Sequence, residues 1–417
     1  MFTFYVSALF SIMLFTFLPQ AQTFLLTETL GIPESQTGVV SGDLAFWAEV
    51  VIIISIGVLG TLSDKIGRKP VYVLGFALIA IGLFLYPSAT TVEQMLGYRL
   101  IFALGSAAAT AMLATVIADY AVDADRGRAS GIQGIMNGLG AMVTVLFLVR
   151  LPQIFQNRGM TPQEAGSAAF YVATGLSVIA AVWLWFGLQN RTDTQKRQRK
   201  SFVQIAREGI DAARDPGIGL AYMAAFNSRG DLAVVGTFLL LWIANHGTEQ
   251  LGMSRAEAVA AAGGFVAIAQ GCALLGAPFF GIMADRINRV TALMIAASFS
   301  AIGYLSTFFI TDPFGPAMIF SLIFIGLGEI SGVISSGVLI AQQAAKDVRG
   351  SVIGVFSFCG AVGILVATKI GGILFDGWRA AGPFVLFGVF SIFVIIWGFI
   401  VRDKVVPRND SAELSAH

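Results

Sequence analysis

Long apolar stretches occupy most of this 417-residue chain. Apolar residues make up 56% of it and charged residues only 12%, whereas ordinary soluble domains carry about 25% charged residues. So few charges would not cover the surface of a soluble protein. A helix that crosses a membrane needs about 20 predominantly apolar residues. The composition therefore predicts an all-α integral membrane protein.

The apolar stretches divide the chain into twelve predicted membrane-spanning helices. They lie near residues 2–26, 38–61, 70–86, 93–119, 129–150, 167–189, 217–244, 256–282, 290–310, 315–341, 351–374 and 380–401. No lysine or arginine precedes Lys65, although a secretory signal has basic residues ahead of its apolar core. We therefore interpret the first stretch as a helix that is retained in the mature protein.

Lysine and arginine are distributed unequally between the two sides that these helices define. If the amino terminus is cytoplasmic, 19 of the 26 basic residues fall on the cytoplasmic side, four on the opposite side, and three within helices. Cytoplasmic loops are enriched in lysine and arginine. The distribution predicts a multi-pass protein of a bacterial-type inner plasma membrane, with both termini in the cytoplasm. Because membrane topology explains where the basic residues lie, we expect no nucleic-acid partner.

Two related loops follow the second and eighth predicted helices. The first is Gly60-Thr-Leu-Ser-Asp-Lys-Ile-Gly-Arg-Lys69, and the second, Gly281-Ile-Met-Ala-Asp-Arg-Ile-Asn-Arg289, begins 221 residues later. The first loop resembles the signature loop of the major facilitator superfamily. The second resembles its degraded copy, with Asn288 in place of the second glycine. The resemblance implies a twelve-helix secondary transporter.

A second pair of segments supports an internal duplication. Arg126-Gly-Arg-Ala-Ser-Gly-Ile132 opens the fifth predicted helix, and Arg349-Gly-Ser-Val-Ile-Gly-Val355 opens the eleventh, 223 residues later. Repeats of this kind build many transporters. We expect two pseudo-symmetric six-helix halves, residues 1–189 and 217–402, with a cytoplasmic linker at 190–216 and a cytoplasmic tail at 403–417.

The linker carries apolar residues at helical spacing within a basic segment. Phe202, Ile205, Ala206 and Ile210 would share one face of a helix. Such a helix could lie on the cytoplasmic membrane surface. A solvated linker is an equally good interpretation of the sequence alone.

The resemblance assigns the signature loop to conformational gating. Asp64 and Arg68 are four residues apart, so a short loop can hold them together. In the transporters that the sequence resembles, this aspartate also faces the start of the eleventh helix, whose dipole favours a carboxylate. The loop would then latch the outward-facing state. The residues that the resemblance places in the two loops are Gly60, Asp64, Gly67, Arg68, Asp285 and Arg289.

Ionisable residues inside predicted helices are candidates for proton coupling, because burying a charge in a bilayer costs several kcal/mol. Glu49 and Glu329 lie near the middle of their helices. Each is either a proton carrier or a carboxyl group that only bonds neighbouring helices. Arg99 begins a partial match to a second motif of the superfamily, in which the arginine is linked to proton transfer. Alternatively, its side chain snorkels to the outer interface.

The seventh predicted helix contains the most polar interior segment, Phe226-Asn-Ser-Arg-Gly-Asp231. Arg229 and Asp231 are two residues apart, so on a straight helix they point to nearly opposite sides. Either each finds a partner on another helix, or Gly230 loosens the helix and lets both reach a cavity. We expect a substrate or coupling role here, with a static charge network as the alternative.

The sequence thus predicts a secondary transporter that moves a small organic solute by alternating access, coupled to protons and acting as a monomer. An uncoupled uniporter and a non-transporting membrane receptor or scaffold are the alternatives. No nucleotide-binding motif, catalytic constellation or metal cluster is visible, so we expect neither enzyme activity nor a cofactor. The candidates for lining the substrate cavity are Gln20, Gln22, Trp47, Asn227, Arg229 and Gln270.

Overall fold

A computed structural model of the chain describes residues 1–120, 126–189, 202–345 and 348–405. These residues form helices and connecting turns without a strand, which confirms the predicted all-α class. Eleven described helices are long and apolar enough to span a membrane. The predicted seventh span is interrupted: α9 (Pro216–Val234) continues through a π-helical turn (Val235–Leu239) into α10 (Leu240–Leu251).

The chain packs as two compact units, and sequence order does not separate them cleanly. Unit 1 comprises residues 1–196, 235–270 and 368–380, and unit 2 comprises 197–234, 271–367 and 381–417. The helices α11 (Arg255–Arg286) and α14 (Arg349–Gly377) each contribute to both units. The six-helix halves expected from the duplication are defined by sequence and remain a prediction.

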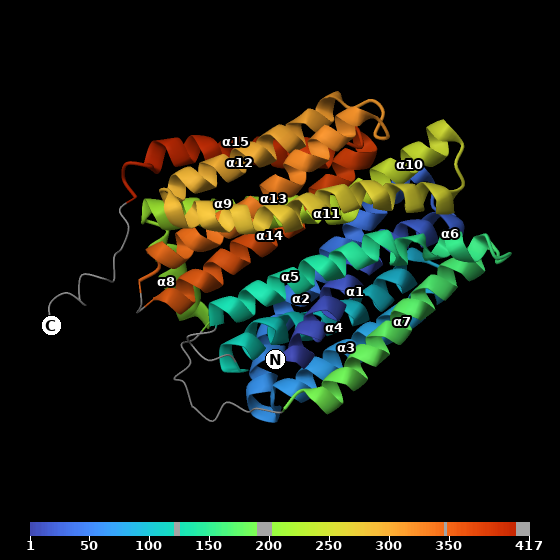
Figure 1. The fold of residues 1–417 in the computed structure, drawn as a ribbon, viewed down its shortest axis with the longest axis horizontal. Helices are drawn as coiled ribbons and strands as arrows, with labels where there is room; N and C mark the ends of the chain where they lie inside the picture. Colours follow the sequence, from blue (N-terminus) through green and yellow to red (C-terminus); the bar gives the residue numbers. More distant parts are fainter. Residues whose placement is uncertain (121–125, 190–201, 346–347, 406–417) are drawn as a thin grey trace. The chain divides into compact units, whose positions relative to one another are not determined.

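Unit 1 is built around the first six predicted spans. Its helix α3 packs against both α4 and α7, and α1 packs against α5 and α7 (Figure 1). Where α3 meets α4, a β-carbon on Gly105 would lie 2.6 Å from the carbonyl oxygen of Gly75, so both helices need glycine for this approach. The helices wholly within unit 1 are α1 (Phe2–Glu28), α2 (Thr37–Ile66), α3 (Arg68–Leu85), α4 (Val92–Tyr120), α5 (Arg126–Leu146), α6 (Leu151–Gln156), α7 (Pro162–Gly187) and α10, with short 3₁₀ turns at Glu34–Gln36, Tyr86–Ser88 and Leu148–Arg150.

Unit 2 holds α9 against α13 and α15, and α12 against the same two helices. The contact between α12 and α13 is again made by glycine: a β-carbon on Gly328 would lie 2.6 Å from the backbone nitrogen of Ser300. The helices wholly within this unit are α8 (Phe202–Ala212), α9, α12 (Arg289–Ser306), α13 (Pro316–Gln343) and α15 (Gly382–Val401), with a 3₁₀ turn at Thr307–Phe309.

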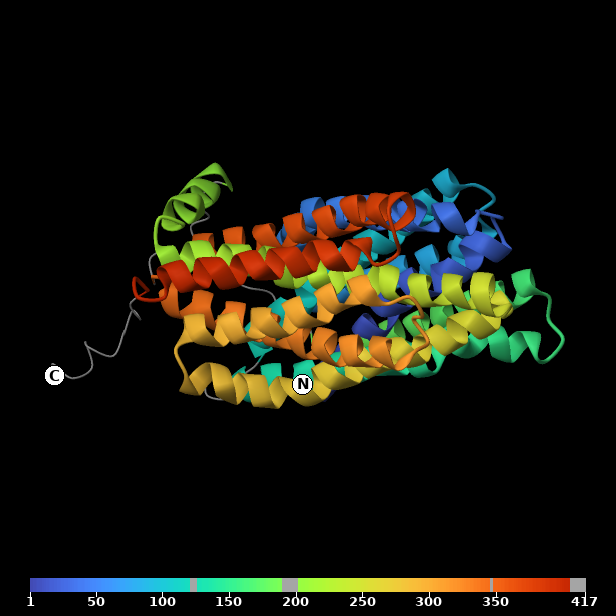
Figure 2. The same cartoon turned by 90° about the horizontal axis from the view of Figure 1, so that it is seen from above.

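The second part of the predicted linker is helical. Figure 2 shows α8, the short green helix at the upper left, at a steep angle to the long helix α9 that follows it. It is fastened on two sides: Glu208 Oε2 accepts a 2.8 Å hydrogen bond from Ser351, and Tyr222 donates one of 2.8 Å to the Gly209 carbonyl. The solvated-linker alternative is therefore wrong for residues 202–212. Residues 190–201 lie outside the described part of the chain.

Candidate functional site

The turn between α2 and α3 places one arginine against two carboxylates. Gly67 separates the helices with φ 99° and ψ 161°, a backbone conformation that essentially only glycine adopts. Nη1 of Arg68 lies 2.5 Å from Asp64 Oδ1, and its Nε lies 2.6 Å from Asp119 Oδ2. The Arg68 side chain is 4% exposed, so the two acids compensate a buried positive charge. We call these three residues the Arg68 cluster.

The pairing of Asp64 with Arg68 was expected, whereas Asp119 was not singled out from the sequence. The signal was available, because an acidic residue ended the fourth predicted span at the same side of the membrane as the signature loop. Gly60 lies within α2, where a β-carbon would meet no atom within 4 Å. Its match to the family pattern therefore has no steric explanation in this structure.

The second loop makes its turn without a positive φ. Asn288 has φ −55° and ψ 129°, and its Oδ1 accepts hydrogen bonds of 2.9 and 3.2 Å from the backbone nitrogens of Val290 and Thr291. It therefore caps α12, which explains physically why asparagine replaces the second glycine. Arg289 Nη1 donates a 2.9 Å hydrogen bond to the Ala284 carbonyl.

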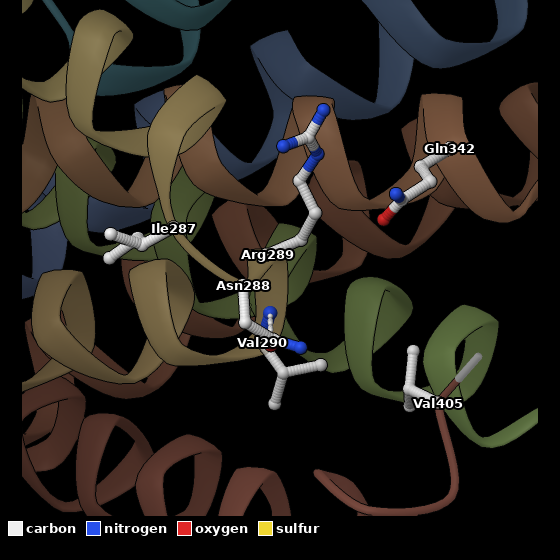
Figure 3. Close-up of a pocket in the computed structure, with 6 residues that line it drawn as sticks. All are labelled: Ile287, Asn288, Arg289, Val290, Gln342 and Val405. Atoms are coloured by element: carbon white, nitrogen blue, oxygen red, sulfur yellow. Dashed lines mark hydrogen bonds between the residues drawn. The ribbon is translucent and has the colours of Figure 1, made fainter. Parts of the chain in front are cut away.

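A cavity of about 160 Å³ lies beside this second turn (Figure 3). The backbone of Asp285 belongs to α11, but its side chain lies outside the described atoms. The cavity gathers none of the residues predicted to bind solute or protons, and of the predicted gating residues it includes Arg289. It is lined by Ile287, Asn288, Arg289, Val290, Gln342 and Val405.

Arg99 is turned into the interior of unit 1. Its Nη1 donates a 2.6 Å hydrogen bond to Gln22 Oε1, and the Tyr86 hydroxyl donates a 2.9 Å bond to the same oxygen. Arg99 is 6% exposed, and both of its partners are fully buried. The snorkelling alternative is therefore wrong, because the guanidinium group bonds inward to α1 rather than reaching the outer interface.

In unit 2, α9 presents Arg229 and Asp231 on different faces, as the spacing predicts. Arg229 is exposed, whereas Asp231 is only 1% exposed. Gly230 does not loosen the helix, since α9 remains α-helical to Val234 and the π-helical turn starts after it. A β-carbon on Gly230 would collide with the ring of Phe387. The absence of a side chain at Gly230 therefore allows α15 to pack closely against α9.

Asp231 meets Glu329 and Tyr304 in a buried group that we call the Tyr304 cluster. The Tyr304 hydroxyl lies 3.0 Å from the backbone oxygen of Asp231 and 3.2 Å from Glu329 Oε1. The two carboxyl groups also interact electrostatically, and Ser300 neighbours Asp231. Among the described residues, however, neither carboxyl oxygen of Asp231 accepts a hydrogen bond of ordinary geometry. Three helices thus bring two acids and one hydroxyl together.

The remaining candidates for the solute cavity differ in their surroundings. Asn227 is 5% exposed and donates a 3.0 Å hydrogen bond to Ser391 Oγ. Gln20 is 2% exposed, and its Oε1 has no partner in the described part of the chain. Among the others, Glu49 and Gln270 are half-buried and Trp47 is 48% exposed.

A polar network in unit 1 was missed by the sequence reasoning. Arg255, which is 5% exposed, donates a 2.8 Å hydrogen bond to Asn245 Oδ1 and lies 3.5 Å from Glu34 Oε1. Thr248 donates a 2.6 Å bond to the same glutamate oxygen. The network joins α10 and α11 to the 3₁₀ turn before α2, and these segments are more than 200 residues apart in sequence. No local pattern connects such distant residues.

Comparison with known proteins agrees with this architecture. The family model described as Major Facilitator Superfamily matches residues 3–368 and 221–416. The chain is 27% identical over 381 residues to magnetosome protein MamH of Paramagnetospirillum magneticum, covering 89% of this chain and 85% of that protein. It is 24% identical to magnetosome protein MamZ of the same organism, where the match covers 90% of this chain and 58% of the relative.

Solved structures share the fold at low identity. A mutant form of the nucleoside transporter NupG has a TM-score of 0.78 at 15% identity, covering 96% of this chain and 98% of that one. A bacterial homologue of the lysosomal transporter Spinster, solved in an inward-facing and occupied conformation, has a TM-score of 0.68 at 14% identity, with coverage of 97% and 96%. The chain is therefore a multi-pass membrane transporter that belongs to the major facilitator superfamily.

Proposed function

We propose that this protein moves a small organic solute across a bacterial inner membrane by alternating access, and that the Tyr304 cluster couples the movement to protons. The observation that carries the proposal is the meeting of Asp231 and Glu329 at Tyr304, with both acids at most 2% exposed. An ionisable group inside a membrane helix is costly and marks a functional site by default.

The tyrosine hydroxyl supplies an argument for a bound proton. Tyr304 has one hydroxyl hydrogen but two oxygen neighbours, the Asp231 carbonyl and Glu329 Oε1. If Glu329 is ionised, both neighbours only accept, and the single hydrogen cannot satisfy both. If Glu329 carries a proton, it donates to Tyr304, and Tyr304 donates to the carbonyl. Protonation therefore completes the hydrogen-bond chain.

Charge balance favours the same conclusion. Two carboxylates that share a buried site are difficult to ionise together, and Asp231 interacts electrostatically with both Glu329 and Arg229. Arg229 is exposed on another face of α9 while Asp231 is buried, so the arginine does not lie inside the buried pair. Glu49 remains a further proton candidate on α2.

The test uses the full-length protein in liposomes. A thermal-shift screen of metabolites first identifies a solute, since a ligand stabilises the state that it binds. Uphill uptake driven by a pH gradient is then compared with exchange of solute for solute, in wild type, Asp231→Asn and Glu329→Gln. Exchange needs the solute site and the conformational change but no net proton movement.

We expect both variants to lose uphill uptake and to keep exchange. Asn227→Asp serves as a control for a changed charge elsewhere on α9, and we expect it to disturb exchange as well. If wild-type uptake does not respond to a pH gradient, the protein is an uncoupled uniporter. If the two variants still concentrate solute, the Tyr304 cluster is not the coupling site.

A further inference from the structure

Three arginines are buried in the described part of the chain, and their charge partners differ. Arg68 pairs with Asp64 and Asp119. Arg255 lies 3.5 Å from Glu34 Oε1 and interacts electrostatically with further glutamates. Arg99, which is 6% exposed, has no carboxylate within salt-bridge distance among the described residues. Its positive charge is met by neutral oxygens alone.

The neutral partners of Arg99 leave hydrogen-bond donors unused. Both Arg99 and Tyr86 donate to Gln22 Oε1, which fixes the orientation of the Gln22 amide because an NH₂ group could not accept from either. Its Nε2 is consequently turned elsewhere, and it is buried without a partner among the described residues, as is Nε of Arg99. Two unused donors therefore lie beside an uncompensated positive charge.

Such an arrangement is costly unless something supplies the missing acceptors and charge. A buried cation needs a counter-charge, and an unpaired buried donor also loses its hydration. We infer that Arg99 and Gln22 bind an anionic group of the transported solute, either a carboxylate or a phosphate. This assignment rests on the transporter function proposed above and names the class of its substrate.

The chemistry of the two residues suits an anion better than a neutral solute. A guanidinium group presents its donors as a planar fork that matches carboxylate and phosphate oxygens, and Gln22 Nε2 adds a neutral donor. Tyr86 acts as a positioning residue, since its hydroxyl holds the Gln22 amide. A neutral solute would leave the Arg99 charge uncompensated.

Binding of matched probes to the purified full-length protein tests this inference. Benzoate is compared with benzamide, succinate with succinamide, and inorganic phosphate with chloride, using the shift in unfolding temperature. We expect a carboxylate or phosphate to stabilise wild type while its uncharged counterpart does not. Carboxylate and phosphate sources are distinguished by which probe acts. Stabilisation by chloride alone, or by amides equally, would overturn the inference.

Variants then locate the binding. Arg99→Gln should abolish the anion-induced shift, Arg99→Lys should keep part of it, and Gln22→Leu should weaken it. Arg158→Gln removes an exposed arginine of the same unit and should leave the shift unchanged. An undiminished shift in Arg99→Gln would show that anions bind elsewhere and would refute the assignment.

A second measurement needs no ligand. Arg99→Met keeps much of the side-chain volume but removes the charge, so its unfolding temperature without ligand should equal or exceed that of wild type. A clear fall would show that Arg99 is a structural residue satisfied by Gln22 and Tyr86, and would contradict the inference. Proton coupling is tested separately at Asp231 and Glu329, so either proposal can fail while the other stands.

Discussion

At the scale of single residues, the Arg68 cluster shows how one side chain joins elements that are distant in sequence. Nη1 of Arg68 pairs with Asp64 on α2, and Nε of the same side chain pairs with Asp119 on α4. A lysine carries the same charge, but it lacks the fork that spans two acids at fixed geometry. The arginine of the signature loop therefore has a bridging role within unit 1 that its match to a motif does not reveal.

We expect Asp119→Asn to reduce the free energy of unfolding by about 1 kcal/mol, because it weakens a charge-assisted hydrogen bond to a partly exposed acid. The measurement is thermal unfolding of the purified protein. Asp119→Asn, Arg68→Lys and the double variant form a cycle that isolates the pair. Additive losses would mean that the two residues do not interact.

Gly67 and Gly60 offer a matched pair in the same loop region. Gly67→Ala places a β-carbon where φ is 99°, and we expect it to destabilise the protein by about 1–3 kcal/mol. Gly60→Ala lies in α2 with open space around the new carbon, so it should be neutral or slightly stabilising. Unfolding temperatures that change equally in both variants would contradict the conformational argument.

At the scale of elements, the seventh span combines a regular helix with a π-helical turn. Single π-helical turns are rare in proteins, and those that occur often lie at functional sites. This one begins four residues after Asp231. The span therefore holds Asp231 of the Tyr304 cluster on a regular α-helix, and its geometry changes at Val235. The division of the compact units falls at the same residue, between Val234 and Val235.

Glycine substitutions on either side of this point should differ in effect. In Gly230→Ala, the new β-carbon would collide with the Phe387 ring, and such overpacking costs about 1–3 kcal/mol. In Gly236→Ala, the β-carbon meets nothing within 4 Å, so stability should hold. Thermal unfolding checks both, and Phe387→Leu should partly rescue Gly230→Ala if the steric explanation is correct.

At the scale of the whole molecule, the distribution of charge and the signature loop bear on orientation and gating. The excess of lysine and arginine on one side predicts cytoplasmic termini. The family architecture predicts that the molecule alternates between two states, and the Arg68 cluster is our proposed gate between them. Each of these proposals can be tested in the intact protein.

The topology is tested with reporters fused after Arg402 and at Arg158. A reporter active only outside the cytoplasm should be silent after Arg402 and active at Arg158, because these positions lie on opposite sides in the predicted arrangement. Activity after Arg402 would overturn either the number of spans or their orientation.

Asp64→Asn tests the gate. The substitution keeps the size of the side chain but removes the charge that faces Arg68 at 2.5 Å. We expect normal membrane insertion with a shift toward inward-facing conformers. The shift should appear as faster labelling of Cys359, a half-buried free cysteine of α14, by a membrane-impermeant thiol reagent added from the cytoplasmic side. Cys272→Ser removes the other cysteine from the measurement. Unchanged labelling together with unchanged transport would exclude this loop from gating.

The sequence alone determined the class of the fold and the pairing of Asp64 with Arg68. Apolar length is a local property, since each helix satisfies its own backbone hydrogen bonds in the bilayer. Residues four apart on a helix or short loop also meet without help from the rest of the chain. The interruption of the seventh span escaped prediction, because a π-helical turn changes the geometry but not the apolar composition.

Tertiary packing decided which polar residues meet across helices. Asp119, Tyr86, Tyr304 and Arg255 each acquire one partner from a segment that is 51 to 232 residues away. Arg99 could equally have snorkelled, because a long side chain near a helix end can reach either water or the interior. Contacts between distant helices depend on which faces pack together. Gly105 allows α3 and α4 to approach closely, and Gly328 does the same for α12 and α13.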